Sequence, residues 1–574
     1  MEISHDALII GSGMADLRAA VELAPEASVA VASKVFPTRS HSGAAQGGIT
    51  AALGNEEEDC WQWHMFDTVK GSDYLADQDA VEIMVQDAPR AILELEHMGV
   101  PFSRNSRGLI AQRAFGGHTR EMGKAPVKRA CYASDRTGRV IVDTLYEQCL
   151  KSSVRFYPEF FLVDLIFQDG RCVGAWFLDL HKGEALRIWA KAVLLATGGA
   201  GRLFRTTSNC TGNTGDGMAV VLSHGIPLQD MEFVQFHPTG LRGVGILLSE
   251  AARGEGGVLR NGLGERFMAR YAPRIMDLAP RDIVSRAILK EIQEGRGIAG
   301  EPYVHLDLTS LGEERIREKL WEVASLARIY AGVDPAREPI PVEPTCHYLM
   351  GGIPTDVDGR VLEDGRERPV EGLFAAGECA CVSVHGANRL GCNSLLDLVV
   401  FGRRAGKAMA RWIREVPAPA PKPAFGPDEP ERLSGMRKAR GPERVPLIRA
   451  QLQSLLMDNC SVFRDEKGLC RALQGILELQ ERMTRVGLRG AGGAFDLELL
   501  EALELEHMLA LARVVVESAR ARKESRGAHF REDFPMRDDS LFLKHTLTFW
   551  DGQRARVEWK PVKLTLFPPQ ERTY

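Results

Sequence analysis

Apolar residues near the start of the chain form short continuous runs, followed by glycines and then by helical spacing. The runs at 7–10 and 28–32 predict buried strands, and residues 17–23 predict the helix between them. Two later runs, at 192–196 and 372–376, also end in glycine-rich turns. Strands that alternate with helices in this way indicate an α/β fold.

The pattern between these runs is first helical and then alternating. Residues 56–110 and 129–150 are predicted to be largely helical, with a loop at 116–118 between them. Residues 154–194 predict a set of antiparallel strands with tight turns at Asp169-Gly170 and Lys182-Gly183. Its expected strands are 155–161, 162–168, 171–179 and 187–189.

The composition shifts again in the second half of the chain. Residues 236–350 contain histidines, arginines and short apolar pieces, and predict an inserted domain with helices at 281–294 and 313–330. Six prolines between Pro417 and Pro430 predict a linker. A bundle of three helices is expected after the linker, and then a tail with strands at 544–550 and 556–562.

Length, charge and cysteine usage restrict the class of protein. The 574 residues suggest roughly four structural units, and the net charge of −5 provides no basic field for nucleic acid. No apolar run approaches the roughly 20 residues that span a bilayer. No signal peptide is recognised at the start, so a cytoplasmic location is expected. The eleven cysteines include no CxxC pair, so we expect no metal or iron–sulfur centre within this chain.

The first glycine turn is typical of a dinucleotide site. Glycines between a strand and a helix let the backbone approach a pyrophosphate at the helix N-terminus. The third glycine of the fingerprint is replaced by Asp16, which is bulkier and carries the same charge as a pyrophosphate. Ser33-Lys34 stands where NAD sites usually carry an acidic residue, which argues mildly against NAD. Further glycine clusters at 198–201 and 214–217 suit a ligand as long as FAD.

The segment 38–48 is rich in small residues, so its backbone can press against a flat ligand. His41 lies in its middle. Taken alone, a loop histidine is more often structural than chemical.

The segment 36–48 resembles the flavin-attachment segment of the flavoprotein subunit of succinate dehydrogenase and fumarate reductase, the respiratory complex II family. Other stretches resemble that family in the same order along the chain. They are 235–240, 250–257, 281–284, 344–355, 376–395, 526–535 and 572–574. The resemblance runs from residue 5 to the end of the chain.

The resemblance implies that His41 carries FAD covalently, through the 8α-methyl group of the isoalloxazine. The cofactor-binding residues that we expect are His41, Gly11, Ser12, Gly13, Met14, Ala15, Asp16, Ser33, Lys34, Ser40, Ser42, Ala45, Gln46, Gly47, Gly48, Asp216, Glu378, Asn393, Ser394 and Leu395. Ser394 is also a plausible N-cap for the helix that begins at this point.

The resemblance further implies a small dicarboxylate as substrate, interconverted between succinate and fumarate by hydride transfer. Arg281 matches the family's proton donor and acceptor, and Glu250 and Arg253 match the relay that refills it. Expected substrate-binding residues are His237, Ser249, His347, Arg389 and Phe115. Ser249 stands where the family is expected to have threonine and keeps the hydroxyl.

The same resemblance implies an α/β, Rossmann-like FAD-binding domain with an inserted α+β capping domain, a C-terminal helical domain and a small extended tail domain. The expected boundaries are 1–235 and 350–415 for the FAD-binding domain, 236–349 for the capping domain, 416–430 for the linker, 431–527 for the helical domain and 528–574 for the tail.

A flavin takes up two electrons, and the sequence indicates no second redox centre in this chain to receive them. The electrons are therefore expected to pass to a partner protein. The family passes electrons to an iron–sulfur subunit and, through membrane anchor subunits, to quinone. A peripheral position on the cytoplasmic face of a bacterial or archaeal membrane is therefore expected, with succinate oxidation favoured as the physiological direction.

Two alternatives stay open from the sequence. An L-aspartate oxidase shares the fold and many motifs but holds FAD noncovalently; the segment around His41 and the linked helical domain argue against it. A catalytically inactive flavoprotein scaffold is supported only by Asp16.

Overall fold

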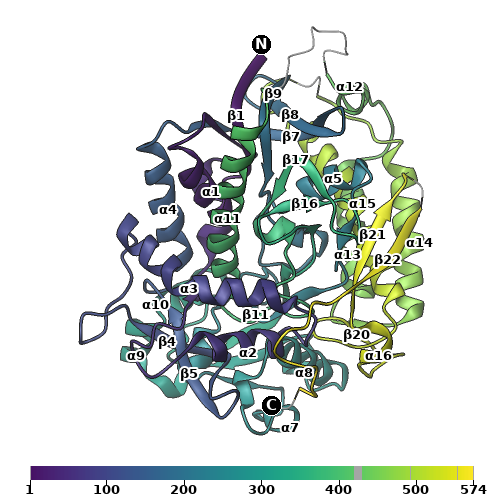
Figure 1. Cartoon of the computed structure of the whole chain (residues 1–574). Helices are drawn as coiled ribbons and strands as arrows, with labels where there is room; N and C mark the ends of the chain where they lie inside the picture. Colours follow the sequence, from purple (N-terminus) through teal and green to yellow (C-terminus); the bar gives the residue numbers. More distant parts are fainter. Residues whose placement is uncertain (1, 419–428, 491–492, 553, 573–574) are drawn as a thin grey trace.

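The computed structural model describes residues 2–418, 429–490, 493–552 and 554–572. Most of the predicted linker, residues 419–428, lies outside these ranges, as do the last two residues. The fold is α/β, with the predicted inserted region, a helical region and an extended tail arranged around one large sheet (Figure 1).

The large sheet is Rossmann-like, because its central strands are parallel and each apolar run of the sequence becomes one of them. Five strands pair in parallel, and β16 (Arg360–Leu362) closes one edge in the antiparallel sense. The parallel strands, in spatial order, are β17 (Pro369–Ala375), β9 (Glu184–Leu195), β1 (Glu2–Ile10), β2 (Val29–Ser33) and β6 (Arg155–Pro158).

One face of this sheet is covered by helices that bury a continuous apolar core (Figure 1). These helices are α1 (Met14–Leu23), α3 (Gln78–Met98), α4 (Thr137–Leu150) and α11 (Asn393–Glu415), with α2 (Trp61–Gly71) beside α3. Helices α1 and α11 approach closely at Gly402, where an added Cβ would lie 2.6 Å from the Ala15 carbonyl oxygen.

The hairpin of β7 (Phe160–Gln168) and β8 (Arg171–Asp179) is joined to the sheet through the first half of β9, and with α5 (Asp216–Ser223) it contributes to the core on the other face. The C-terminal helices share the core of this face, and Figure 1 shows them beside it. They are α12 (Glu431–Arg437), α13 (Val445–Asn459), α14 (Glu466–Met483) and α15 (Leu497–Ala521).

The inserted region has its own core around a four-stranded antiparallel sheet. Its strands are β11 (Val234–Leu241), β14 (Ile340–Leu349), β13 (Val304–Asp307) and β12 (Val258–Arg260). Its helices are α6 (Ala251–Gly254), α7 (Met268–Tyr271), α8 (Arg281–Gln293), α9 (Glu313–Lys319) and α10 (Trp321–Leu326).

The tail returns to the earlier part of the chain as a hairpin. Strands β21 (Lys544–Trp550) and β22 (Ala555–Pro561) follow the short helix α16 (Asp539–Phe542), and β21 pairs with β10 (Leu228–Gln229). The buried ring of His545 joins the two parts, because it bonds to Asp230 at 2.6 Å and to Asp77 at 3.2 Å. Four further short strands are β15 (Ile353–Pro354), β18 (Ala380–Cys381), β19 (Phe463–Arg464) and β20 (Phe530–Arg531).

Some predicted elements are wrong. Residues 116–118 belong to β4 (Gln112–Arg120), which pairs with β5 (Ala125–Cys131) across a register shift between Ala114 and Thr119. The predicted helix at 129–150 therefore begins only at Thr137. The pairing of β5 with β4 and with β3 (Ile49–Thr50) overrides the local helical spacing.

The predicted antiparallel strands in residues 154–194 also differ from the observed strands at both ends of this region. The predicted strand 155–161 is divided at Glu159, whose φ of +62° turns the chain from β6 into β7. The strands expected at 187–189 and 192–196 form one strand, β9, because its first half pairs with β8 and its second half with β17. The predicted helix 313–330 is divided into α9, α10 and a π-helical turn (Ala327–Ala331).

Candidate functional site

A cavity of about 510 Å³ lies between the carboxyl ends of β1 and β9 and the inserted region. All of the predicted site residues line it except Arg253 and Asn393. Its wall also includes Thr197, Ser208, Cys210, Asn213, Glu322, Tyr330, Tyr348 and Cys392, which the sequence did not single out.

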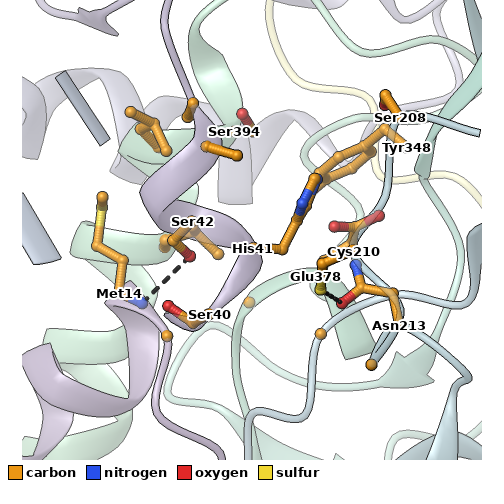
Figure 2. Close-up of a pocket in the computed structure, with 18 of the residues that line it drawn as sticks. Met14, Ser40, His41, Ser42, Ser208, Cys210, Asn213, Tyr348, Glu378 and Ser394 are labelled. Carbon is orange, nitrogen blue, oxygen red and sulfur yellow. Dashed lines mark hydrogen bonds between the residues drawn. The ribbon is translucent and has the colours of Figure 1, made fainter. Parts of the chain in front are cut away.

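The first wall is the glycine turn between β1 and α1. Gly11 has a φ of +132°, and an added Cβ would lie 2.4 Å from the Ala196 carbonyl oxygen, so only glycine fits here. The Met14 N–H donates to Ser42 Oγ at 3.3 Å and ties the small-residue segment to the start of α1 (Figure 2). The N-terminus of α1, with its partial positive charge, suits an anion.

His41 opens a short 3₁₀ turn (His41–Ala44) on the same wall. Figure 2 shows its side chain directed away from Met14 and Ser42, toward the side of the cavity that holds Tyr348 and Glu378. Burial lowers the pKa of His41 to about 4, so the imidazole is neutral at pH 7. A neutral imidazole is the nucleophilic form of histidine.

Arg113, which the sequence did not single out, fixes the next part of this segment. Its guanidinium donates to the carbonyl oxygens of Gln46 at 3.0 Å and Gly47 at 2.6 Å. It also pairs with Asp135 at 3.1 Å. The backbone of the segment is therefore held from behind, which leaves its other side to the cavity.

Lys34 and Asp216 meet at the end of the cavity near the helical region. Lys34 Nζ lies 2.6 Å from Asp216 Oδ2 and 2.9 Å from Glu504 Oε1 of α15. His507 Nδ1 bonds to the other Asp216 oxygen at 2.9 Å. Burial opposes ionisation of Asp216, but Lys34 outweighs it and the pKa of Asp216 is lowered.

Buried polar atoms on the cavity wall fit a flavin dinucleotide. Among the described residues, the side-chain oxygens of Ser12, Ser40, Gln46 and Thr197 are buried without a hydrogen-bond partner. Such atoms normally find partners, so a polar ligand is the expected one. Burial raises the pKa of Glu378 to about 7, which leaves a carboxyl group able to donate as well as accept.

Two arginines lie at the other end of the cavity, where the inserted region covers it. Arg281 is the first residue of α8 and is 7 % exposed, and Arg389 is 3 % exposed. Arg281 Nε donates to Glu250 Oε2 at 2.9 Å. Arg389 Nη1 donates to Ser394 Oγ at 3.0 Å and lies over the Tyr348 ring.

Gln235 joins the two arginines, a role that the sequence did not reveal. Its Oε1 accepts from Arg281 Nη1 at 3.1 Å and from Arg389 Nη2 at 3.5 Å. Its Nε2 donates to Asn388 Oδ1 at 2.9 Å and to the Arg389 carbonyl at 2.8 Å. The shared amide oxygen therefore holds the two guanidinium groups close together despite their like charge.

Two histidines lie at the same end of the cavity as the two arginines. The rings of His237 and His347 lie 5.3 Å apart, and His237 Nε2 is buried without a partner among the described residues. Burial, followed by the charge of Arg281, lowers the pKa of both histidines well below the ordinary value. Both rings are neutral at pH 7 and present polar atoms without adding charge.

Glu250 connects Arg281 to the interior of the inserted region. Burial opposes its ionisation, but Arg253 and Arg281 outweigh this and lower the pKa of Glu250. Gly116 N–H donates to Glu250 Oε1 at 3.1 Å, which explains why β4 is irregular at this glycine. Arg253 lies behind Glu250, at 3.6 Å from its Oε2.

The prediction of Ser394 as the N-cap of α11 is wrong, and the structure places the Asn393 side chain away from the cavity wall. The N-cap is Cys392, with a φ of +65°, and Ser394 lies inside the helix with its hydroxyl bonded to Arg389. Asn393 does not line the cavity, because its side chain bonds to Thr50 at 2.7 Å and to His64 at 2.9 Å behind it.

Comparisons with known proteins give the family of this chain. The family profile described as FAD binding domain matches residues 6–395, and the one described as fumarate reductase flavoprotein C-term matches residues 449–574. The succinate dehydrogenase flavoprotein subunit of Coxiella burnetii is 48 % identical over 99 % of this chain and 98 % of its own. The mitochondrial subunit of Oryza sativa is 46 % identical over 100 % of this chain and 93 % of its own.

A solved structure of an E. coli quinol fumarate reductase variant superposes with a TM-score of 0.93 at 40 % identity. The superposition covers 100 % of this chain and 99 % of that one. Fold and site together define an FAD-binding flavoprotein oxidoreductase. Within that class, the chain belongs to the family of succinate dehydrogenase and fumarate reductase flavoprotein subunits.

In the part of the chain that the structure describes, no helix is both long and apolar enough to cross a membrane.

Proposed function

We propose that this chain interconverts succinate and fumarate as the catalytic flavoprotein subunit of its complex, with succinate oxidation as the physiological direction. The observation that carries the proposal is the pair Arg281 and Arg389, held together by Gln235 and faced by two neutral histidines. Two cations and neutral donors at one end of a flavin cavity suit a small dianion. Arginine also meets carboxylates bidentately.

FAD, when bound, would supply a hydride acceptor for succinate oxidation and a hydride donor for fumarate reduction. Arg389, His237, His347 and Ser249 bind the two carboxylates and orient the substrate. Arg281 holds or delivers the proton that is exchanged with the neighbouring substrate carbon. The ionised Glu250, 2.9 Å from Arg281 Nε, exchanges that proton with Arg281 and passes it toward Arg253.

The activity is tested with the complex purified from cells that express this chain. We expect succinate to reduce an artificial electron-accepting dye, and Arg281→Lys to slow that reduction at least about 100-fold while FAD stays bound. A complex that holds FAD but does not respond to succinate or fumarate would contradict the proposal.

Covalent attachment of FAD to His41 is the second part of the proposal. It is supported by the position of His41 on the cavity wall and by its neutral ring. A denaturing gel viewed under ultraviolet light tests it, because only covalent flavin stays with the polypeptide. We expect a fluorescent band near 63 kDa that is lost in His41→Ser and kept in the matched control His224→Ser, which lies outside the cavity. A dark band for the unchanged chain would contradict attachment.

Association with an iron–sulfur subunit and membrane anchor subunits, at the cytoplasmic face of a bacterial or archaeal membrane, is the third part. It is supported by the relatives, which are named as flavoprotein subunits. Copurification from detergent-solubilised membranes tests it. We expect iron and acid-labile sulfide to elute with the flavin fluorescence; elution of the flavin without iron would contradict the partnership.

A further inference from the structure

Asp16 replaces the third glycine of the dinucleotide fingerprint, and the structure shows how the turn accommodates it. It is the third residue of α1 and is 1 % exposed. Its side chain folds back toward the start of the helix, where Asp16 Oδ2 accepts a hydrogen bond from Gly13 N–H at 2.7 Å. The carboxyl group thus occupies the turn that a pyrophosphate would approach.

The second carboxyl oxygen is buried without a donor. Asp16 Oδ1 has no hydrogen-bond partner among the described residues. An added Cβ at Gly11 would lie 2.2 Å from Asp16 Oδ1 and 2.4 Å from the Ala196 carbonyl oxygen, so both oxygens border the same small space. Asp16 Oδ1 can donate a hydrogen bond only when it carries a proton.

Among the described residues, Asp16 forms no ion pair with a cation that would compensate a negative charge. Arg18 of α1 and Arg403 of α11 pair instead with Glu22 and Glu94. The titratable group that faces Asp16 from the strand ends is the thiol of Cys379, and burial raises its pKa to about 12, which keeps it neutral.

Burial also raises the pKa of Asp16 well above its ordinary value, against a weaker opposing effect of the Gly13 N–H. An ionised carboxylate would in addition repel an incoming pyrophosphate. These conditions all favour the neutral acid, which has an O–H to donate.

We propose that Asp16 is a protonated carboxylic acid that presents a neutral hydrogen-bond donor to the pyrophosphate of FAD, in place of the glycine of the fingerprint. The inference rests on the FAD site of the proposed function and adds a residue of this chain that binds the cofactor. It also explains how a residue that carries a negative charge in water is compatible with a flavoprotein.

Infrared difference spectroscopy tests the protonation state directly. The spectrum of the FAD-loaded protein minus that of Asp16→Asn isolates one carboxyl group. We expect the carbonyl band of a protonated carboxylic acid, which shifts when the solvent is exchanged for D₂O. The same subtraction with Glu378→Gln gives a reference band from another buried acid. A difference spectrum with only the bands of an ionised carboxylate at Asp16 would overturn the proposal.

Affinity for FAD gives a second readout and keeps the test valid if one variant folds poorly. In a His41→Ser background, where FAD binds noncovalently, we expect Asp16→Asn to bind FAD within about threefold of its parent. Asp16→Gly, which restores the fingerprint, is expected to bind within tenfold. If Asp16 were ionised, both variants would bind FAD more than tenfold more tightly, because a like charge is removed.

The outcomes separate this inference from the proposed function. If FAD binds but the protonated band is absent, only the role of Asp16 fails. If neither the parent nor any variant binds FAD, the proposed function fails with it.

Discussion

Replacing Gln235 by leucine tests the arrangement of the two arginines. The side chain is fully buried, and its amide makes four hydrogen bonds within 3.5 Å, two of them from guanidinium groups. Leucine has a similar volume but cannot accept from Arg281 or Arg389. The two cations then lose their shared acceptor while their mutual repulsion remains.

The magnitude follows from the shorter of the two charged bonds. Gln235 Oε1 lies 3.1 Å from Arg281 Nη1, whereas the 3.5 Å contact with Arg389 is at the limit of a hydrogen bond. A hydrogen bond to a charged group contributes about 2 kcal/mol. Its loss in the transition state corresponds to a decrease of roughly 30-fold in kcat/KM.

Steady-state succinate oxidation by the purified complex is the assay. We expect kcat to decrease more than KM increases, because Arg281 acts on the proton and Arg389 on binding. Gln78→Leu is the matched control: Gln78 is also fully buried but binds the backbone of residues 565–567. It is expected to lower the Tm with little effect on kcat/KM. Equal kinetics for Gln235→Leu and the unchanged protein would refute the reasoning.

Three further predictions concern catalysis, pH and packing. Arg281→Lys keeps the charge but loses the planar fork, so turnover is expected to decrease at least about 100-fold while bound FAD, measured by absorbance, is unchanged. Burial alone would lower the pKa of His545, but the carboxylates of Asp230 and Asp77 outweigh it and raise this pKa from 6.5 to about 9. The protonated ring therefore stabilises the fold fully below pH 6.5, and this contribution is lost as the pH rises through about 9. Urea unfolding of His545→Gln should lack this pH dependence. Gly402→Ala forces a methyl against the Ala15 carbonyl, so we expect a loss of about 1–3 kcal/mol in urea unfolding and a lower FAD content.

The core of the sheet could be predicted because parallel strands buried on both faces are continuous apolar runs. Residues 7–10 and 192–195 became parts of β1 and β9 for this reason. The predicted helix at 281–294 ends one residue earlier in the structure, and the tail strand at 544–550 has the predicted bounds.

The errors occur where distant contacts override local spacing. The region around Gly116 was predicted as a loop, because nothing nearby shows that its N–H binds Glu250, 134 residues later. The helical spacing after Arg129 is overridden in the same way. This guanidinium is buried against Asp59 and Asp67, and the backbone around it pairs as β5.

The site was predicted by family resemblance more than by physical pattern. Arg281 and Arg389 are 108 positions apart, and no spacing rule joins them. Gln235 was passed over because a glutamine carries no charge and no reactive atom. Its importance is visible only where the structure places one amide oxygen between two guanidinium groups.

The most direct test of the account is anaerobic reduction of the purified flavoprotein complex by a candidate substrate, followed by flavin absorbance. The account predicts that succinate bleaches the flavin band, that fumarate restores it, and that L-aspartate has no effect. Bleaching by L-aspartate without a response to succinate would contradict the assignment of this site to succinate and fumarate.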